Sequence, residues 1–160
     1  MKIGVISDTH IPRAAAELPP EIYKAFKGVD LILHAGDLVE ISVLDELKKI
    51  AKTEAVCGNM DESEVRNSLP QKRIISTGGF KIGLIHGHGS PFRMMDTVKK
   101  EFPQKVDAIV FGHSHLPVNE LKDGVLFFNP GSPTDKIFAK YNSYGILTIN
   151  KEIKGKIIRL

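Results

Sequence analysis

The chain has 160 residues, 42% of them hydrophobic and 26% charged, which is typical of one globular domain and excludes a disordered or fibrous protein. The single cysteine, Cys57, excludes a disulfide framework and a cysteine-rich zinc site, and the net charge of +3, spread without a basic run, argues against nucleic acid as an obligate partner. No apolar run is long enough to span a membrane, and residues 1–7 are too short for a signal peptide, so we expect a cytoplasmic protein without a membrane partner.

Strands and helices alternate in the first half of the chain. Apolar runs predict buried strands at residues 2–7, 31–33 and 54–56. Between them, Ile22, Tyr23 and Phe26 share one face of a predicted helix that ends at Gly28, and residues 41–51 repeat apolar positions at helical spacing. This alternation is typical of parallel βα units.

Hairpin signals dominate the second half. Further strands are predicted at residues 73–76, 80–85, 106–111, 118–121, 125–128, 144–149 and 153–158. Gly78-Gly79 and Asp123-Gly124 each separate two of these strands and predict hairpins. Ser90-Pro91 predicts an N-cap and the first turn of a helix that runs to about Phe102. The whole pattern predicts an α/β fold in one domain, residues 1–160, with mixed sheets covered by helices.

Polar side chains able to bind a metal ion follow many of the apolar runs. The six histidines all have this placement: His10, His34, His86, His88, His113 and His115. The same holds for Asp8, Asp37, Asn59 and Asp61. Because ligands bind beyond the carboxyl ends of the strands in α/β sheets, we expect five distant segments to present these groups at one edge.

Taken singly, each motif is weakly specific. The D-x-H at residues 8–10 could be a capping Asp beside an exposed His, and the G-D at 36–37 and G-N at 58–59 are common turn dipeptides whose glycine lets the backbone turn sharply. The H-x-H at 113–115 can direct two imidazoles to opposite sides of an extended turn, which suits two metal ions better than one. Residues 86–88 form a second H-x-H, and having both is harder to explain by chance.

Taken together, the motifs have a specific order. They read D-x-H, G-D, G-N-x-D, H-G-H and G-H-x-H along the chain. This order resembles the calcineurin-like metallophosphoesterase superfamily, and the short chain with its Asn129-Pro130-Gly131-Ser132 segment is similar to the small YfcE-type phosphodiesterase branch. The resemblance covers residues 8–132 and implies a four-layer α/β/β/α sandwich of two mixed sheets flanked by helices.

The resemblance also implies a centre of two divalent metal ions. The first ion would be bound by Asp8, His10, Asp37 and His115. The second would be bound by Asp37, Asn59, His86 and His113. Nitrogen and oxygen ligands suit Mn²⁺, which we expect first, with Ni²⁺, Fe²⁺, Zn²⁺ and Co²⁺ as alternatives. The implied reaction is hydrolysis of a small phosphate ester, chiefly a phosphodiester, by a hydroxide that bridges the two ions.

One position departs from the family pattern. Many members carry His directly after the motif Asn, where this chain has Met60, which cannot transfer a proton. His88 is the candidate general acid in its place, with water as the alternative, so the expected catalytic residues are Asp37, Asn59 and His88. A site without a strong acid favours good leaving groups, and we expect activated aryl phosphodiesters to react faster than alkyl monoesters.

Four nearby segments have less specific interpretations. Asp61 either orients a ligand or caps the following turn, and capping is favoured. His34 is either a partner of Asp37 or a polar strand end. Arg13 either meets a substrate phosphate or is simply solvated, and solvation is favoured. Residues 129–132 are expected to form a tight turn that supports the metal-binding loops.

Other functions stay open. A non-catalytic scaffold for protein interaction would resemble a retromer subunit that has lost part of its metal site, but the seven assigned side chains favour catalysis. A nuclease, a nucleotide pyrophosphatase or a small (cyclic) nucleotide hydrolase could use the same centre. A mononuclear metal protein with a regulatory role is a third alternative. The sequence leaves open whether the chain forms a homo-oligomer, as a dimer or tetramer.

Overall fold

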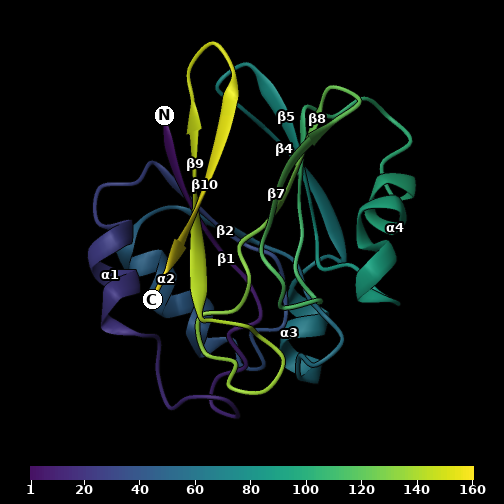
Figure 1. The fold of residues 1–160 in the computed structure, drawn as a ribbon. Helices are drawn as coiled ribbons and strands as arrows, with labels where there is room; N and C mark the ends of the chain where they lie inside the picture. Colours follow the sequence, from purple (N-terminus) through teal and green to yellow (C-terminus); the bar gives the residue numbers. More distant parts are fainter.

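Two five-stranded sheets face each other and carry helices on their outer sides in the computed structural model, which describes residues 1–160 (Figure 1). The strands are β1 (Lys2–Ile6), β2 (Leu31–His34), β3 (Thr53–Ala55), β4 (Lys72–Thr77), β5 (Phe80–Ile85), β6 (Ala108–Val110), β7 (Val118–Lys122), β8 (Val125–Asn129), β9 (Ser143–Ile149) and β10 (Ile153–Arg159). The helices are α1 (Pro20–Phe26), α2 (Ser42–Ile50), α3 (Ser63–Ser68), the 3-10 turn η1 (Pro91–Arg93) and α4 (Met94–Lys100). None of the helices is long and apolar enough to cross a membrane.

Both sheets are mixed. In the first, with the order β10-β9-β1-β2-β3, β1, β2 and β3 run parallel while β9 and β10 run antiparallel to their neighbours. In the second, with the order β4-β5-β6-β8-β7, the central strands β5, β6 and β8 are parallel and the two edge strands are antiparallel. The α/β class and the two mixed sheets are therefore confirmed, as are both predicted hairpins.

Three apolar layers hold these elements together. Ile3 and Val5 of β1 face the layer between the sheets, where they join residues such as Val110 and Phe128 from the second sheet. The intervening Gly4 faces outward, and a Cβ there would lie 2.8 Å from the buried ring of Phe26 in α1. This alternation is the two-residue period of a strand, and it lets one strand serve two apolar layers.

The outer layers seat the helices. One layer packs α1 and α2 on the first sheet and includes Ile22, Phe26 and Leu47. The other packs α4 on the second sheet through Val98 and Phe102. The resulting order of layers is helix, sheet, sheet, helix, as the sequence predicted.

Some element boundaries differ from the sequence predictions. The short helix α3 was not predicted, because its only buried residue is Val65 and one apolar position gives no periodic signal. The helix after Pro91 begins as a 3-10 turn, and Ser90 makes no side-chain capping hydrogen bond. That helix ends at Lys100 rather than at Phe102.

Candidate metal centre

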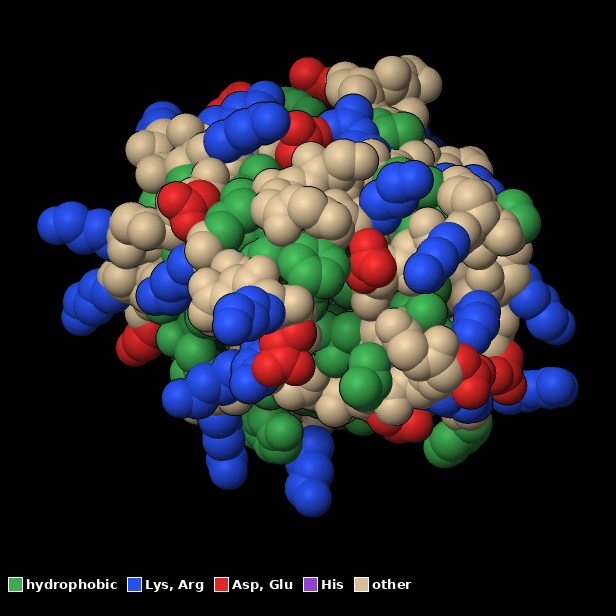
Figure 2. All heavy atoms as spheres, turned by 90° about the horizontal axis from the view of Figure 1, so that it is seen from above, with side chains coloured by type: hydrophobic (Ala, Val, Ile, Leu, Met, Phe, Trp, Pro, Cys, Tyr) green, Lys and Arg blue, Asp and Glu red, His purple; other side chains and the backbone are tan.

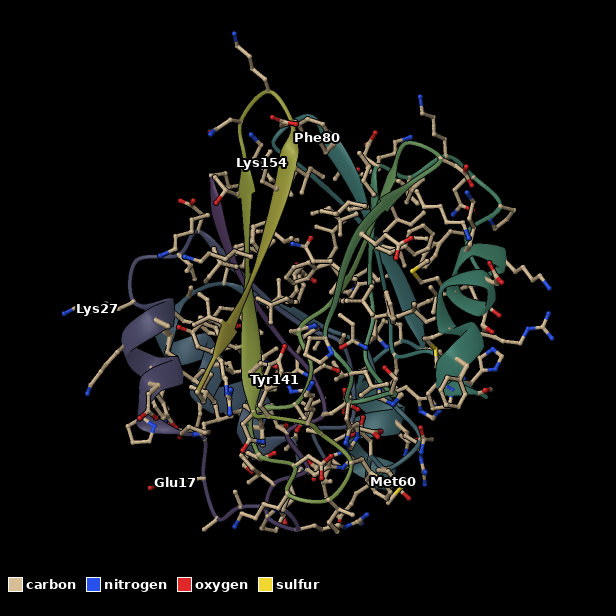
Figure 3. All side chains as sticks on the ribbon, viewed as in Figure 1. Glu17, Lys27, Met60, Phe80, Tyr141 and Lys154 are labelled. Atoms are coloured by element: carbon tan, nitrogen blue, oxygen red, sulfur yellow. The ribbon has the colours of Figure 1, made fainter.

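The loops that carry the predicted site residues meet at one end of the paired sheets. This is the lower end in Figure 3, where Met60 is labelled. Figure 2 shows the opposite end, which carries the hairpin turns and many Lys and Arg side chains, and no histidine is visible there. Segments from residue 8 to residue 115 thus converge at the carboxyl ends of the parallel strands, as expected for a ligand site.

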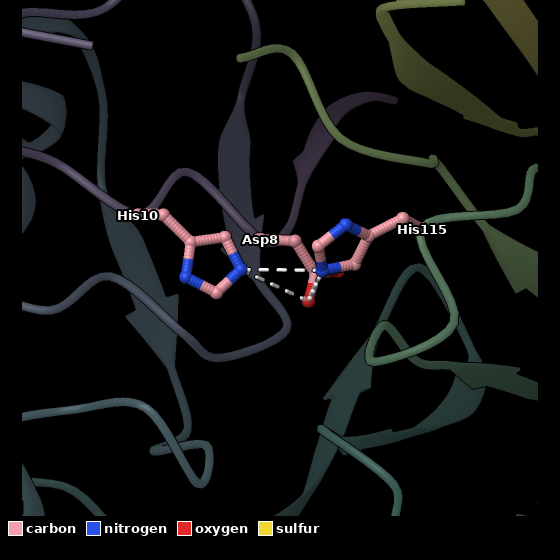
Figure 4. Close-up of side chains that lie close together, drawn as sticks. All are labelled: Asp8, His10 and His115. Atoms are coloured by element: carbon pink, nitrogen blue, oxygen red, sulfur yellow. Dashed lines mark hydrogen bonds and ion pairs between the residues drawn. The ribbon is translucent and has the colours of Figure 1, made fainter. Parts of the chain in front are cut away.

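Asp8, His10 and His115 form one group of possible ligands (Figure 4). His115 Nε2 lies 3.3 Å from Asp8 Oδ1 and 3.2 Å from His10 Nε2. His10 Nε2 lies 3.9 Å from the same Asp8 oxygen. These atoms all fall within 4.8 Å of one another, so a single cation could contact all three side chains.

Asp8, Asp37 and His86 form a second, fully buried group. His86 Nε2 lies 3.2 Å from Asp37 Oδ2 and 3.9 Å from Asp8 Oδ1. Asp37 Oδ2 is also 3.8 Å from His10 Nε2, so this oxygen lies between the two groups. The other oxygen, Oδ1, accepts the N–H of Met60 at 2.7 Å, which fixes the carboxylate.

Asn59 and His113 extend the second group toward solvent. Asn59 Oδ1 lies 3.1 Å from His113 Nδ1, and the rings of His113 and His86 are 5.3 Å apart. His113 Nε2 lies 3.2 Å from the carbonyl of Gly89, and if it donates there the Nδ1 lone pair faces the Asn59 oxygen. The structure therefore brings together all seven side chains for which the sequence predicted a role as metal ligand.

The two carboxylates at the heart of the centre lack ordinary counter-ions. Asp8 is fully buried and Asp37 is 2% exposed. The only charged partners within 4.0 Å of either are histidines, with no Lys or Arg among them. Burying two carboxylates without compensating positive charge is strongly unfavourable. Divalent cations would supply that charge, and the nitrogen and oxygen donors present suit them.

His86 is oriented as a metal ligand would be. Its Nδ1 lies 2.8 Å from the carbonyl of Ala35, which can only accept, so Nδ1 carries the hydrogen and donates it. Its Nε2 is the one buried side-chain nitrogen or oxygen in the chain without a hydrogen-bond partner. A buried nitrogen that lacks a hydrogen-bond partner and faces two carboxylates fits a cation placed between them.

The same charges shift the pKa values of the site residues. Burial lowers the pKa of His86, but the neighbouring carboxylates of Asp37 and Asp8 outweigh this and raise the pKa to about 9. Burial also lowers the pKa of His115, while interactions with Asp8 and Asp135 raise it to about 9. Burial raises the pKa of Asp8, yet its hydrogen bond with His115 and the charges of His86 and His115 hold the pKa below its usual range. The centre thus attracts positive charge, which protons supply when metal ions do not.

Backbone strain is concentrated at this centre. Seven residues other than glycine have a positive φ: Asp8, His10, Asp37, Val39, His113, His115 and Asp123. Five of them are predicted ligands, and only Asp123 lies away from the site, in a hairpin turn. This conformation costs roughly 1–2 kcal/mol for a residue with a side chain. Such strain persists where the surrounding structure enforces it, and functional sites are a common place for it.

Two glycines of the motifs are required by close contact. A Cβ at Gly58 would collide with the carboxylate of Asp37, and a Cβ at Gly112 would collide with the hydroxyl of Ser7 and approach Asp8 Oδ2 to 2.7 Å. Neither glycine has a positive φ, so the sharp turn expected at Gly58 is not the reason for it, whereas Gly36, where the same turn was expected, does have a positive φ of 92°. Gly58 and Gly112 are glycines because any side chain would displace a carboxylate of the centre.

Asp135 is a site residue that the sequence analysis missed. Its Oδ2 lies 2.5 Å from His115 Nδ1 and leaves His115 Nε2 directed at Asp8 and His10. The same oxygen accepts the N–H groups of two residues downstream in its own loop. A carboxylate behind a metal-binding histidine fixes the tautomer and the ring orientation. Asp135 lies within the loop between β8 and β9 rather than directly after a strand, and it belongs to no spaced motif, so nothing in the sequence marks it.

Asp61 and Arg13 form hydrogen bonds to the backbone of the loops around the site. Asp61 accepts the N–H groups of Val39 at 2.6 Å and Gly58 at 2.7 Å, so it joins two ligand loops, and the expected capping of the following turn is wrong. Arg13 is exposed, as favoured, and donates to the carbonyl of Met60 at 3.3 Å.

The turn at residues 129–132 supports the ligand loops as expected. Asn129 Nδ2 donates to the carbonyl of Gly112 at 2.9 Å, and Ser132 Oγ donates to the carbonyl of Asp8 at 2.7 Å. Both bonds are buried, and both end on loops that carry predicted ligands. This turn therefore fixes the spacing between the loops that follow β1 and β6.

His34 connects the loops that follow β1 and β2. Its Nδ1 accepts the N–H of Gly36 at 3.2 Å, and its Nε2 lies 3.1 Å from Thr9 Oγ1. It is fully buried and does not touch Asp37 directly. It therefore positions the loops on either side of it rather than a ligand side chain.

His88 lies apart from the other predicted residues. Its exposed ring is 3.5 Å from Glu101 Oε1. It lines a neighbouring polar cavity of about 480 Å³ that also contacts Asn59 and His86. The cavity that contains His10, Asp37 and His115 does not include His88.

A comparison with protein families identifies the fold. The family model for the calcineurin-like phosphoesterase superfamily domain matches residues 1–152. The chain belongs to this superfamily. Calcineurin-like phosphoesterases use divalent metals, so membership makes the chain a metal-dependent phosphoric ester hydrolase by family and accounts for the two groups of possible ligands.

Individual relatives agree with this membership. The chain is 45% identical over 138 residues to a protein of Methanothermobacter thermautotrophicus described as a probable metallophosphoesterase, covering 84% of this chain and 78% of that one. An archaeal phosphodiesterase of known structure is similar over the full length of both chains, with 26% identity and a TM-score of 0.78. Vps29 of Entamoeba histolytica, solved with bound zinc, has 26% identity and a TM-score of 0.77 over 99% of each chain.

His34 should make the stability of the metal-free protein depend on pH. Burial lowers its pKa from 6.5 to about 3, so below pH 6.5 the unfolded chain binds a proton that the folded chain rejects. Stability contributed by neutral His34 is therefore complete above pH 6.5 and is lost as the pH falls toward 3, by at most about 1.4 kcal/mol per pH unit. Urea denaturation in EDTA between pH 4 and 7 should show a shallower slope for His34→Gln than for the parent. Equal slopes would contradict a buried neutral histidine.

Proposed function

We propose that the chain is a phosphodiesterase whose reaction depends on two divalent metal ions bound at the carboxyl ends of its strands. The observation that carries the proposal is the pair of buried carboxylates, Asp8 and Asp37, whose only charged partners are histidines. The similarity to an archaeal phosphodiesterase supports diesters as the substrate class.

The distances support a division of the ligands into two sets. One ion would be held by Asp8, His10, Asp37 and His115. The other would be held by Asp37, Asn59, His86 and His113.

Asp37 is the better bridge between the two sets. Its Oδ2 lies 3.2 Å from His86 Nε2 and 3.8 Å from His10 Nε2, one residue of each set. Asp8 Oδ1 lies at 3.9 Å from both of these nitrogens and closer, at 3.3 Å, to His115. The second oxygen of Asp8 accepts hydrogen bonds from Ser7 Oγ at 2.7 Å and from the N–H of His113 at 3.1 Å. Asp8 belongs to both groups of possible ligands, but its Oδ1 lies nearest to His115, so we assign it to the first ion.

Bound ions would activate water as the nucleophile and neutralise the charge that develops on the phosphate. The protein's own contribution is to hold the ligands in place before the substrate arrives. Asp135 orients His115, Ala35 orients His86, and the N–H of Met60 fixes Asp37. Arg13 borders the same cavity and adds a positive charge at its edge. No serine or cysteine nucleophile is required.

Proton donation to the leaving group is the weakest part of this centre. Met60 borders the cavity and has no proton to give. His88 remains the proposed general acid only for a leaving group that reaches the neighbouring cavity, where its ring lies beside Glu101. For other substrates we favour water, and we expect a preference for ester groups that leave without protonation.

A protein-interaction scaffold is the second candidate, supported by the similarity to Vps29. The two candidates differ in what the ligand set must do. A scaffold has no need for seven converging side chains able to bind metal, five of them held in strained backbone. The complete set therefore favours catalysis, and the experiments below separate the two.

Activity and metal content together test the proposed function. Protein loaded with Mn²⁺ should bind two ions per chain and hydrolyse bis(p-nitrophenyl) phosphate faster than an alkyl phosphate monoester. Asp37→Ala removes the bridging carboxylate, so kcat should fall by about two orders of magnitude or more. Asp45→Ala, a matched change at an exposed position of α2, should leave kcat unchanged.

Three outcomes would contradict the proposal. A metal content that never exceeds one ion per chain would favour a mononuclear protein. Full activity of Asp37→Ala would exclude the bridging role. Two bound ions without turnover of any ester, with diesters and monoesters tested alike, would favour the scaffold.

Asp135 should control metal affinity without contacting the metal. Asp135→Asn keeps the size of the side chain but removes the charge that faces His115 Nδ1. Loss of such a carboxylate weakens metal binding about 10- to 100-fold. Competition with a fluorescent chelator measures the affinity for Mn²⁺, and Asp45→Asn serves as the control. Unchanged affinity would show that His115 needs no support from Asp135.

A further inference from the structure

Exposed apolar side chains gather beside the metal centre. Ile137 is 81% exposed and Phe138 is 72% exposed, although large apolar side chains are usually buried. Met60, 43% exposed, lines the same cavity as Ile137 and Phe138. Exposed apolar groups of this kind often mark a place where a ligand or partner binds.

These residues and the predicted ligands line a single cavity. It has a volume of about 470 Å³, within the range of small-molecule sites. Its lining includes His10, Asp37 and His115 together with Ile137 and Phe138, whose two side chains form the apolar wall of the cavity. A phosphate held at the metal centre would therefore place its ester group near this apolar wall.

The loop that carries Ile137 and Phe138 is held in place by Asp135, the same side chain that supports His115. Asp135, which supports His115, also accepts the N–H groups of Ile137 at 2.8 Å, Phe138 at 3.0 Å and Ala139 at 2.8 Å. One buried carboxylate thus sets both the ligand histidine and the backbone that carries the two apolar side chains. Ile137 and Phe138 are therefore exposed on a loop whose backbone is held in place by hydrogen bonds to Asp135.

The ring of Phe138 lies close to the reacting region. Its centroid is 5.9 Å from that of His115, and the two rings are nearly perpendicular, at 77°. With 72% of the residue exposed, most of the ring remains free to contact another group. Aromatic rings pair with one another in offset or edge-to-face arrangements, which a second ring entering this cavity could adopt.

We propose that Phe138 and Ile137 form a recognition site for an aromatic ring carried by the phosphate ester substrate. The inference rests on the proposed function, because the phosphate must be held at the metal centre for the ring to reach this wall. The neighbouring cavity is less suited to this role, since charged and polar groups such as Arg66, Lys72 and Glu101 line it. An aryl group and a nucleobase share the required chemistry.

Binding of phosphonates, which are not hydrolysed, tests the inference. Isothermal titration of the Mn²⁺-loaded protein with phenylphosphonate and with methylphosphonate compares a ring with a methyl group on the same anion. An aromatic pair contributes enough for the phenyl compound to bind about three- to tenfold more tightly. Phe138→Ala should abolish most of this preference while leaving methylphosphonate binding unchanged. Adenosine monophosphate, compared with ribose 5-phosphate, provides the matching arm for a nucleobase.

Phe92→Ala is the matched control. Phe92 is 94% exposed and lies outside this cavity, so the substitution removes the same side chain without touching the proposed site. The preference for the phenyl compound should survive it. Circular dichroism should show that both variants keep the parent fold, since neither ring is buried.

The possible failures can be told apart. If both phosphonates bind equally and Phe138→Ala changes neither, the inference is wrong and the proposed function stands. If neither phosphonate binds the Mn²⁺-loaded protein while diesters are still hydrolysed, the inference alone is wrong; if no ester is hydrolysed either, the proposed function is overturned as well. Phe138→Ala could instead leave binding unchanged and alter only the oligomeric state measured by analytical ultracentrifugation. The apolar wall would then be a contact between copies of the chain, and the inference would again be wrong. A preference in the adenosine pair alone would assign the site to nucleobases, and one in the phenyl pair alone to simple aryl groups.

Discussion

Two buried carboxylates without a lysine or arginine partner impose the constraint on which this structure depends. Asp8 and Asp37 lie at the ends of two neighbouring parallel strands, where they are close to each other and shielded from water. Negative charge in such a place is stable only when positive charge accompanies it. The histidines provide this in part as protonated side chains, and His86 keeps one buried nitrogen directed at the gap between the carboxylates.

The rest of the site follows from holding these groups together. The ligands come from loops that begin where strands of two different sheets end, so the sheets must pack in one fixed relation. Apolar residues of both sheets, such as Val5 and Val110, supply that packing. Polar groups behind the proposed ligands fix the loops, and the strained backbone of five of these residues shows that the framework is strong enough to enforce their geometry. Glycines at positions 58 and 112 leave space for the carboxylates.

Much of this arrangement could be predicted from the sequence. Continuous apolar runs located the parallel strands, and Gly78-Gly79 and Asp123-Gly124 located the hairpins. The ordered motifs identified seven side chains that the structure brings to one place, because residues directly after parallel strands must share an edge of the sheet. Apolar runs, turn dipeptides and residues directly after a strand are all defined by neighbours in the chain, so they can be recognised in the sequence alone.

What escaped prediction depends on contacts between distant segments. Asp135 supports His115 from the middle of the loop between β8 and β9, not from a position directly after a strand, so only the folded chain shows the contact. The reason for Gly58 is its distance from Asp37, a residue more than twenty positions away. His88 follows its strand like the other histidines, yet its side chain turns into a different cavity. Placement after a strand predicts where a residue lies and does not predict which way its side chain points.

Anomalous X-ray scattering from crystals of the Mn²⁺-loaded protein tests the central claim most directly. Two peaks are expected, roughly 3.5–4 Å apart, on either side of the Asp37 carboxylate. One peak should lie beside His10 and His115, and the other beside His86 and His113. A map with no peak between the buried carboxylates, or with manganese bound only at the protein surface, would contradict the claim.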